Sequence, residues 1–488
     1  MAVVVGHDEQ LLIGGRWLEA RGGERFEVTD PATGELVGSV PDAAHEDVIA
    51  AIDAAAAALE GWRSTAAIER GRLLRRAGDL LRERKDEVAA VMTAEQGKPL
   101  AEAAGEVEYA ASFFDWFAGE AERVYGQVVP ALNPASRVLV LRQPVGVAAA
   151  ITPWNFPAAM MTRKLGPAIA AGCTSIVKPA SATPLTAALV LRALEDAGAP
   201  PGVVNLISSR SSAMVAKTLF ADRRVRKVSF TGSTEVGKRL IALSAGQVKR
   251  LSLELGGHAP YIVFEDAELE PAVDGLIASK FRNAGQTCVC ANRVFVQRRI
   301  YAEFAELLRE KVGGMQVGPG DRPGVVVGPL IDAHAVEKVA EHVEDATARG
   351  ARLLVGGERL VDGDFARGSF YAPTVLADVT PEMLISSEET FGPVAALSPF
   401  ESEEEAIRLA NDSVYGLAAY FHTRDYARLM RVAERLDYGI IGANTGAISA
   451  ANVPFGGVKE SGYGREGGAF GIDEYLDVKY VLVADVGR

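Results

Sequence analysis

The sequence is poor in cysteine and histidine, with three cysteines and six histidines among 488 residues. Cys173, Cys288 and Cys290 are too few and too unevenly spaced for a disulfide framework, which favours a reducing compartment. A bridge between Cys288 and Cys290 is a poor resting state, because Cα atoms two residues apart lie near the limit of unstrained bridging. These two cysteines also lack the spacing of a structural zinc site, and no histidines form an HExxH pattern. We therefore expect no metal site.

Long hydrophobic runs and basic clusters are missing as well. No apolar run reaches the ~18–20 residues that a membrane-spanning helix needs. The formal net charge is −13, and no Lys/Arg-rich run is interleaved with aromatic residues, so neither a nucleic acid nor an anionic membrane is an expected partner. The segment MAVVVGHDEQLLIGG has neither a signal-peptide nor a transit-peptide pattern. We expect a cytoplasmic location.

The composition is that of a packed protein, with 48% hydrophobic and 24% charged residues. From residue 146, the short apolar runs GVAAAIT, TSIVK, VVNLIS and KVSFT alternate with amphipathic stretches at 158–171, 183–197, 211–220 and 234–244. A second series, YIVF, RVFVQ, RLLVG, VAALSPF, LAAYFHT and GIIGANT, follows ELGG at 254–257. This alternation is typical of βαβ units that build parallel sheets.

The predicted fold is therefore α/β, with two doubly wound, Rossmann-like parallel-sheet domains and a small β-rich segment. We assign residues 1–124 and 145–253 to the first domain, 254–447 to the second, and 125–144 and 474–488 to the β-rich segment. The β-rich runs at 128–144 and 475–485 should form one small sheet that is completed by another subunit, since isolated hairpins are marginal. A long helical stretch over 66–96, stopped by Gly97, and a helix over about 101–124 are interpreted as packing elements.

Two strand ends carry residues suited to a nucleotide. FTGSTEVGK opens a helix after the fourth strand, where Gly232, Ser233 and Gly237 would let backbone amides approach a pyrophosphate. Lys178, in KPAS, ends another strand of the same sheet and could bind ribose hydroxyls. Each feature alone is weak, because glycine-rich turns and solvated lysines are common and GxGxxG spacing is absent. Together they predict a nucleotide at the carboxyl ends of the strands.

The segment GQTCVCAN at 285–292 holds the candidate nucleophile. Cys288 lies in a polar loop, and a free thiol needs nearby dipoles or a base to become reactive. Glu254, just before two glycines, could be that base or could activate water. A cysteine in a polar loop is by itself more often inert. A Cys–His hydrolase or acyltransferase in which His258 is the base is an alternative, and it would need no bound nucleotide.

Seven motifs, which occur in a fixed order along the chain, favour a catalytic over an inert Cys288. They are TPWNFP, KPAS, FTGSTEVG, ELGG, GQTCVCAN, EETFGPV and NVPFGGVKESGYGRE. Together they closely resemble the aldehyde dehydrogenase superfamily, over nearly the whole chain. The resemblance implies a nicotinamide-binding domain, a catalytic domain and an oligomerisation segment, which match the three regions above. It also implies a homodimer or homotetramer.

The resemblance implies a role for each matching residue. Cys288 attacks the aldehyde carbon, Asn155 and the Cys288 backbone amide hold the oxyanion, and hydride leaves for a nicotinamide. Glu254 then activates the water that hydrolyses the thioester. A non-catalytic relative would not need all three side chains. The residues that match cofactor contacts are Thr152, Trp154, Lys178, Ser181, Gly232, Ser233, Glu389 and Phe391.

The cofactor preference is predicted from Ser181. NAD-preferring relatives often carry a glutamate there, whose charge would repel a 2′-phosphate by about 1–4 kcal/mol per charge pair. Ser181 removes that repulsion, so we expect NADP in preference to NAD.

Three finer matches, Arg163, Arg282 and Ser449, resemble the succinate-semialdehyde dehydrogenase branch, where they clamp a remote carboxylate. Guanidinium groups suit a carboxylate because they can pair with both oxygens. Each arginine taken alone would more often be a helix-surface residue paired with an acid. Glutarate semialdehyde is the main rival substrate, since one CH₂ discriminates by only about 1–3 kcal/mol.

Cys290 is also shared with the semialdehyde branch. One hypothesis is that oxidation joins Cys290 reversibly to Cys288 and blocks activity. The alternative, that Cys290 is a small buried filler, has equal weight.

Overall fold

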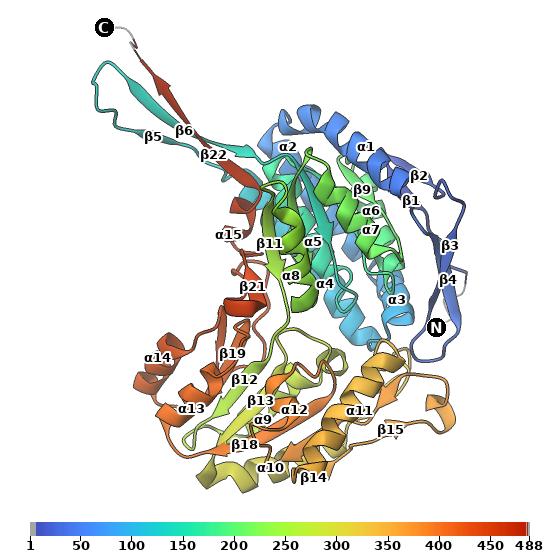
Figure 1. Ribbon diagram of the computed structural model, residues 1–488, viewed down its shortest axis with the longest axis vertical. Coiled ribbons are helices and arrows are strands. Elements are labelled where there is room, and N and C mark those ends of the chain that lie inside the picture. Colours follow the sequence, from blue (N-terminus) through green and yellow to red (C-terminus); the bar gives the residue numbers. More distant parts are fainter. Residues whose placement is uncertain (1–5, 485, 487–488) are drawn as a thin grey trace.

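The computed structural model describes residues 6–484 and 486, and within this range one sheet has eight strands in the order β2-β1-β9-β8-β7-β10-β11-β21 (Figure 1). The predicted ranges that include residues 1–5, 485, 487 and 488 extend outside the described residues there. The five neighbouring strands β9, β8, β7, β10 and β11 are parallel. At the two edges of the sheet, β1, β2 and β21 pair antiparallel. The strands are β1 Leu11–Ile13, β2 Arg16–Leu18, β7 Val147–Ile151, β8 Thr174–Lys178, β9 Val204–Leu206, β10 Val225–Thr231, β11 Arg250–Glu254 and β21 Gly462–Tyr463.

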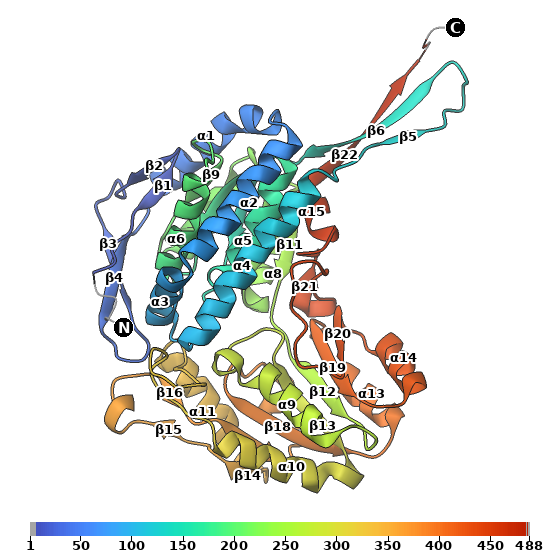
Figure 2. The ribbon, with the colours of Figure 1, turned by 180° about the vertical axis from the view of Figure 1, so that it is seen from behind.

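Helices cover both faces of this sheet, as Figure 2 shows for α2, α3 and α4 on one side. Each face of the sheet packs into its own hydrophobic core, and the side chains of β7 alternate between them. Ala148 and Ala150 belong to one core, and Val147 and Ala149 belong to the other. A strand buried on both faces reads as a continuous apolar run, which explains GVAAAIT. The helices are α1 His45–Arg63, α2 Ala67–Glu83, α3 Lys85–Gln96, α4 Leu100–Ala121, α5 Ala159–Ala171, α6 Pro184–Asp196, α7 Ser212–Ala221 and α8 Thr234–Ser244.

The prediction of one helical stretch over 66–96 is wrong in one respect: the structure has two helices there, α2 and α3. The chain breaks at Arg84, whose φ of −101° and ψ of 16° are not helical. Buried residues Leu80, Leu81 and Val88 continue the apolar stripe across the break, and neither proline nor glycine marks it. Gly97 ends α3 with φ 92°, as predicted.

A second sheet has seven strands among the described residues, in the order β14-β17-β18-β13-β12-β19-β20. All neighbours are parallel except the edge strand β14, predicted from RLLVG, which pairs antiparallel with β17. The strands are β12 Ala259–Val263, β13 Ala291–Gln297, β14 Arg352–Val355, β17 Thr374–Ala377, β18 Val394–Phe400, β19 Ala418–His422 and β20 Ile440–Ala443. The helices of this half are α9 Leu269–Lys280, α10 Arg298–Gly313, α11 Ala333–Ala348, α12 Leu384–Ser387, α13 Glu403–Asn411 and α14 Tyr426–Arg435.

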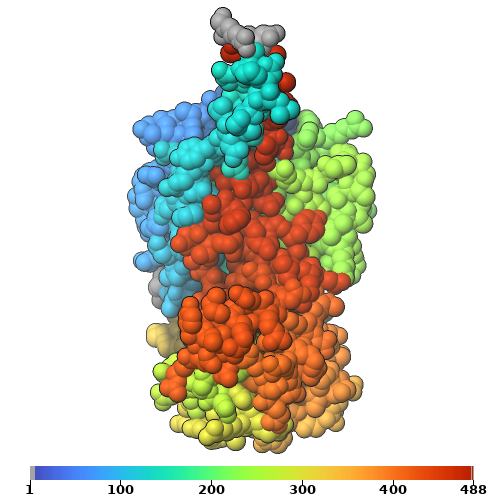
Figure 3. Space-filling view, turned by 90° about the vertical axis from the view of Figure 1, so that its left-hand side faces the viewer, coloured from blue at the N-terminus to red at the C-terminus, as the bar shows by residue number. Residues whose placement is uncertain are grey.

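A sheet of β5 (Gln127–Val129), β6 (Arg137–Pro144) and β22 (Leu476–Val483) projects from the body, as Figures 1 and 3 show. β22 pairs antiparallel with β6 along its whole length, from Leu476 opposite Pro144 to Val483 opposite Arg137. The two β-rich runs predicted to share one sheet therefore do so. A separate hairpin, β3 (Arg25–Thr29) with β4 (Leu36–Pro41), lies near the N-terminal end of the described chain.

The predicted fold class is confirmed: two doubly wound parallel sheets and a small β-rich segment. The domain boundaries given above stay a prediction. In the first sheet the strand order reverses between β7 and β10, and such a switch point is where open α/β sheets bind ligands. Within the part of the chain that the structure describes, no helix has the length and apolar character needed to cross a membrane.

Candidate active site

The candidate nucleophile Cys288 follows a strained turn. Asn283, Ala284 and Gly285, at the end of the short helix η1 (Arg282–Gly285), have φ values of 51°, 54° and 76°. Left-handed backbone costs about 1–3 kcal/mol at each non-glycine residue and is kept only where surrounding structure enforces it. At Gly285 a Cβ would lie 2.1 Å from the Gly392 carbonyl oxygen, so only glycine fits. The turn is thereby held against the EETFGPV loop.

The ELGG motif approaches the nucleophile from the other sheet. A Cβ at Gly257 would lie 2.1 Å from the carbonyl oxygen of Cys288, so glycine permits this close contact. The Gly257 amide also donates to Oε1 of Glu389 at 3.0 Å. Burial raises the pKa of Glu389 to about 7. The segments ELGG, GQTCVCAN and EETFGPV, far apart in the chain, therefore meet around Cys288.

Asn155 completes this group from the end of β7. Its buried side chain donates from Nδ2 to the carbonyl oxygen of Gln286 at 3.0 Å. A primary amide has two N–H donors, so this bond orients the amide and leaves the second N–H available. TPWNFP and the nucleophile loop are thus joined directly.

A buried ion pair that the sequence patterns did not reveal supports Asn155. Lys98 Nζ donates to the Asn155 carbonyl oxygen at 2.7 Å and pairs with Glu106 Oε2 at 2.5 Å. Glu106 Oε1 accepts from the amides of Ala158 and Ala159 at the start of α5. The pair therefore connects α4 to the loop that carries Asn155. Glu106 stands between Ala103 and Ala110 on the apolar stripe of α4, and a charge there was the available signal.

Cys288 keeps part of its surface accessible, yet burial raises the pKa of its thiol to about 12. The positive charge of Arg163 acts in the opposite direction, while Glu389 and Glu254 add to the effect of burial. In this state the sulfur is a thiol at neutral pH. A reactive thiolate requires a base or a further positive charge close by.

Glu254, the last residue of β11, is buried, and burial followed by the charge of Glu466 raises its pKa well above the usual range. Neither carboxyl oxygen has a hydrogen-bond partner among residues 6–484 and 486. Glu466 behaves oppositely: burial acts to raise its pKa, but Lys164 and Arg163 outweigh it and lower the pKa to about 2. The site thus holds one carboxyl that binds a proton readily beside one that stays charged.

The two predicted clamp arginines lie near the nucleophile. Arg163 is fully buried, with Nε 2.5 Å from Glu466 Oε2 and its guanidinium 4.1 Å from the centre of the Phe455 ring. Arg282 lies over Phe156 at 5.2 Å. Within the described chain, Nη1 of Arg163 and Nε of Arg282 are buried without a hydrogen-bond partner. Ser449 lines a neighbouring pocket and is partly buried.

The predicted cofactor contacts lie at the switch point of the first sheet. Burial lowers the pKa of Lys178 to about 8, and its Nζ donates to Ser212 Oγ at 2.7 Å. Ser181, three residues beyond the end of β8 at Lys178, is exposed. Asp42, the acid whose charge acts on Lys178, is already paired with Arg210 at 3.1 Å. An ammonium and hydroxyls without a free carboxylate fit a phosphorylated ribose.

The remaining predicted contacts surround the same edge. Thr152 is buried at the end of β7, where its amide donates to the Lys178 carbonyl at 3.1 Å. Trp154 and Phe391 make an edge-to-face pair at 5.6 Å, so two aromatic rings from the two halves of the chain meet. At Gly232 a Cβ would lie 2.4 Å from the Phe230 ring. Ser233 caps α8 by accepting from the Val236 amide. A nicotinamide and its diphosphate fit this arrangement.

The side chains of His258 and Cys290 each contact a backbone carbonyl oxygen of another residue. The Nε2 atom of His258 lies 3.0 Å from the Ser386 carbonyl oxygen, and the imidazole packs against Tyr415. No hydrogen bond joins His258 to Cys288 in the described residues. Cys290 is buried, unpaired, and has its sulfur 3.5 Å from the Lys280 carbonyl oxygen. The alternative of a Cys–His pair therefore lacks its base.

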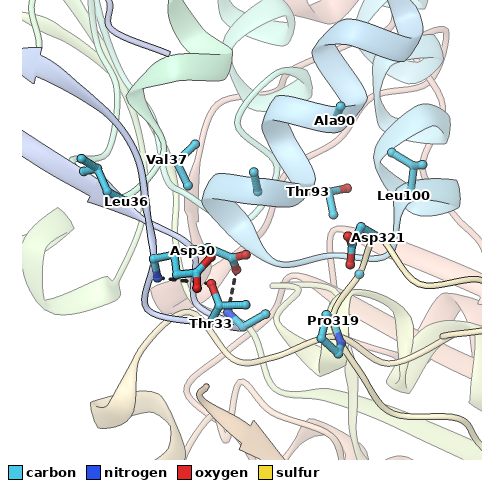
Figure 4. A pocket seen from close by; sticks show the side chains of 13 residues that line it. Asp30, Thr33, Leu36, Val37, Ala90, Thr93, Leu100, Pro319 and Asp321 are labelled. Carbon is cyan, nitrogen blue, oxygen red and sulfur yellow. Dashed lines mark hydrogen bonds between the residues drawn. The ribbon is translucent and has the colours of Figure 1, made fainter. Parts of the chain in front are cut away.

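A separate pocket of about 100 Å³ lies between the β3–β4 hairpin, α3 and the loop at Pro319 (Figure 4). Apolar side chains such as Val37 and Leu100 form its wall, and Asp30 and Asp321 stand at its rim. Burial raises the pKa of Asp30 to about 6. None of the predicted site residues lines this pocket, so it is not part of the site around Cys288.

Comparison with known proteins agrees with this geometry. The model of the aldehyde dehydrogenase family matches residues 17–481. A succinate-semialdehyde dehydrogenase [NADP(+)] of Escherichia coli (strain K12) is 52% identical over 475 residues, 97% of this chain and 98% of the relative. A glutarate-semialdehyde dehydrogenase of Pseudomonas putida is 51% identical over 476 residues, 98% of each chain.

The crystal structure of an E. coli NADP-dependent enzyme superposes with a TM-score of 0.96, at 52% identity and with 98% of each chain covered. The match extends over both sheets and the projecting segment. This chain belongs to the aldehyde dehydrogenase family.

Proposed function

We propose that this protein oxidises succinate semialdehyde to succinate with NADP⁺. The observation that carries the substrate class is a pair of buried guanidinium nitrogens, Nη1 of Arg163 and Nε of Arg282, which have no partner among the described residues. The charge of Arg163 acts on Cys288, and Arg282 begins η1, which leads into the nucleophile loop. An unpaired buried donor costs about 1–3 kcal/mol, and a carboxylate on the substrate would satisfy both. The relatives named as semialdehyde dehydrogenases support the same class.

The first chemical step belongs to Cys288. Glu254, in its ionised form, takes the proton of the Cys288 thiol and passes it to solvent. The resulting thiolate attacks the aldehyde carbon, and the C=O π electrons become an oxyanion that the second Nδ2–H of Asn155 and the Cys288 amide would stabilise. Such a donor contributes about 2.7–4 kcal/mol in the transition state. The resulting thiohemiacetal is joined to the enzyme through sulfur.

NADP⁺, when bound at the switch point, supplies the acceptor for the hydride that leaves this carbon. Lys178, Ser181, Trp154 and Phe391 would hold it, together with Glu389 at the ribose. Loss of hydride leaves a thioester on Cys288. Glu254 takes a proton from water, whose oxygen attacks the thioester carbon, and Cys288 departs as thiolate. The raised pKa of Glu254 suits it to accept this proton.

Glutarate semialdehyde is the second candidate substrate, because a relative at 51% identity bears that name. One methylene separates the two acids, and hydrophobic contacts alone discriminate such a difference only weakly. We also propose a cytoplasmic homodimer or homotetramer joined through the sheet of β5, β6 and β22. Exposed apolar side chains on this sheet and on its β5–β6 connection support that assembly: Val128, Leu132, Val478 and Tyr480.

The test compares the wild type with Arg282→Gln. Arg282 is preferred to Arg163, whose removal would leave the buried Glu466 with one fewer positive partner. We expect the KM for succinate semialdehyde to rise about 10–100-fold, and that for butanal to change little, since only the acid loses a charged hydrogen bond. Arg309→Gln, on the exposed face of α10, is the matched control.

Wild-type catalytic efficiency is measured with succinate semialdehyde, glutarate semialdehyde and butanal, each with NADP⁺ and NAD⁺. We expect the four-carbon acid with NADP⁺ to be the best pair. An equal loss on the acid and on butanal in Arg282→Gln would reject the carboxylate clamp, and a strong wild-type preference for NAD⁺ would reject the cofactor assignment.

A further inference from the structure

Tyr109, on α4, lines the same pocket as Ser449, one of the three predicted clamp residues. Tyr109, Trp116 and Ser449 line one pocket of about 520 Å³, within the ~300–1,000 Å³ usual for small-molecule sites. Tyr109 comes from a helix that the apolar pattern assigned to packing alone. Its ring does pack, lying 4.8 Å from the ring of Phe113. The hydroxyl is therefore the part of this side chain that packing does not explain.

The Tyr109 hydroxyl oxygen is buried and, as far as the described residues extend, makes no hydrogen bond. Buried tyrosine hydroxyls normally find a partner, and one left alone costs about 1–3 kcal/mol. Arg163 Nη1 and Arg282 Nε have the same deficit, as described above. Three elements, α4, α5 and η1, thus each contribute a buried polar atom that has no hydrogen-bond partner among the described residues.

These groups are close enough to interact. The positive charges of Arg163 and Arg282 both act on the Tyr109 hydroxyl and oppose burial, which raises its pKa overall. The hydroxyl is consequently protonated at neutral pH and can donate. Among these groups only the phenol oxygen can also accept, and the Arg163 guanidinium lies close to it. An Arg163 N–H directed at that oxygen would leave the phenol O–H as a donor. Together the groups are then complementary to a carboxylate, which only accepts and has about four lone-pair sites.

We propose that Tyr109 is a specificity-determining residue whose hydroxyl donates a hydrogen bond to the remote carboxylate of the substrate. The inference rests on the proposed function, because it concerns the same carboxylated aldehyde. It adds a neutral donor from α4 to the two guanidinium groups. A neutral donor adds directionality without another buried charge, so it helps to select a planar, acceptor-only group over an uncharged chain end.

The experiment is Tyr109→Phe, which keeps the ring against Phe113 and removes the hydroxyl alone. We expect the KM for succinate semialdehyde to rise about tenfold, with kcat and the KM for butanal nearly unchanged, because a hydrogen bond to a charged group is lost in binding. The ratio of variant to wild-type KM should stay constant from pH 6.5 to 8.5, since the phenol is protonated throughout. Tyr426→Phe, at an exposed position on α14, is the matched control.

Succinate provides a second readout that needs no turnover of the acid. It should inhibit butanal oxidation by the wild type, and about tenfold more weakly in Tyr109→Phe. A wild type that does not prefer succinate semialdehyde to butanal would overturn the proposed function itself. A wild type with that preference and a Tyr109→Phe variant that retains it in full, with unchanged succinate inhibition, would overturn the role of Tyr109 alone.

Discussion

Cys288 shows how one residue can be placed for reaction before it is ionised. Its backbone is held by the contact with Gly257, and yet burial keeps the thiol protonated near neutral pH. Position and reactivity are therefore controlled separately: the loop supplies the first, and a base or a bound cation must supply the second. This arrangement protects the sulfur from unwanted reaction when no substrate is present.

The pH dependence of alkylation tests this. Because the pKa is raised to about 12, the thiolate fraction of the cofactor-free enzyme increases about tenfold for each pH unit below that value. We expect the rate of Cys288 modification by iodoacetamide, followed by mass spectrometry, to rise in this way from pH 7 to 9 without a plateau. A plateau near pH 8 would contradict the raised pKa. Cys288→Ser is the control, since Cys173 and Cys290 are buried.

The sequence indicated most of the residues around Cys288 because their motifs depend on local chemistry. Gly257 and Gly285 are needed where backbones nearly touch, and such glycines stand out in a sequence. Tyr109 was missed, since its ring fits the apolar stripe of α4 and only the fold shows that its hydroxyl is unsatisfied. The redox pairing of Cys290 stays a prediction.

Helix α4 links the packing of the first sheet to the chemistry. It carries Glu106, whose two oxygens contact Lys98 on one side and the start of α5 on the other. Lys98 in turn holds the carbonyl of Asn155. We therefore propose that helix packing determines where Asn155, the proposed oxyanion donor, stands, and that the buried ion pair positions it rather than adding stability.

The double variant Lys98→Met with Glu106→Gln separates these roles. Replacing both charges leaves neither one buried and unpaired, so we expect the melting temperature to remain near that of the wild type. The contact to Asn155 is lost, so kcat should fall at least about tenfold while KM changes little. Steady-state kinetics and thermal unfolding measure the two effects.

Glu106→Gln alone should lower both kcat and the melting temperature, because Lys98 then stays buried without its counter-charge. The exposed pair of Arg72 and Glu69 on α2 offers a control in Glu69→Gln, which should change neither quantity. If the double variant kept full kcat, the positioning role of the pair would be refuted.

At the level of elements, long periodic runs were predictable and short irregular ones were not. The strands from β7 to β10 are short, apolar-rich and almost fully buried segments that Pro, Gly or polar residues follow. β1, β2 and β21 span only two or three residues each, too few to show a period, and they pair through contacts distant in sequence. The break between α2 and α3 at Arg84 could not be predicted from the sequence, because the apolar stripe continues across it.

At the scale of the whole molecule, one part, the sheet of β5, β6 and β22, has no hydrophobic core of its own among the described residues. The sheet of β5, β6 and β22 stands away from the body, and apolar side chains remain exposed along it: Val128 73%, Val478 71% and Tyr480 62%. A small isolated sheet with such surfaces is marginal in water. A second copy of the chain would cover it, which is why assembly through this segment is proposed.

Charge placed on that sheet should separate the subunits. For Val128→Glu combined with Tyr480→Glu, we expect light scattering to give a mass near the 51.6 kDa of one chain, while the wild type gives twice or four times that value. Buried like charges in an interface are strongly unfavourable. Arg76→Glu, exposed on α2, is the control. An unchanged assembly in the double variant would place the interface elsewhere.

The far edge of the first sheet has a consequence for how the protein is made. β21 pairs with β11, whose last residue is Glu254, and Glu466 follows close behind to neutralise Arg163 and Lys164. Residues 462–466 thus finish the surroundings of a group specified more than 200 codons earlier. A nascent chain that has grown only to residue 450 would lack this edge, so we expect catalysis to await synthesis beyond Glu466.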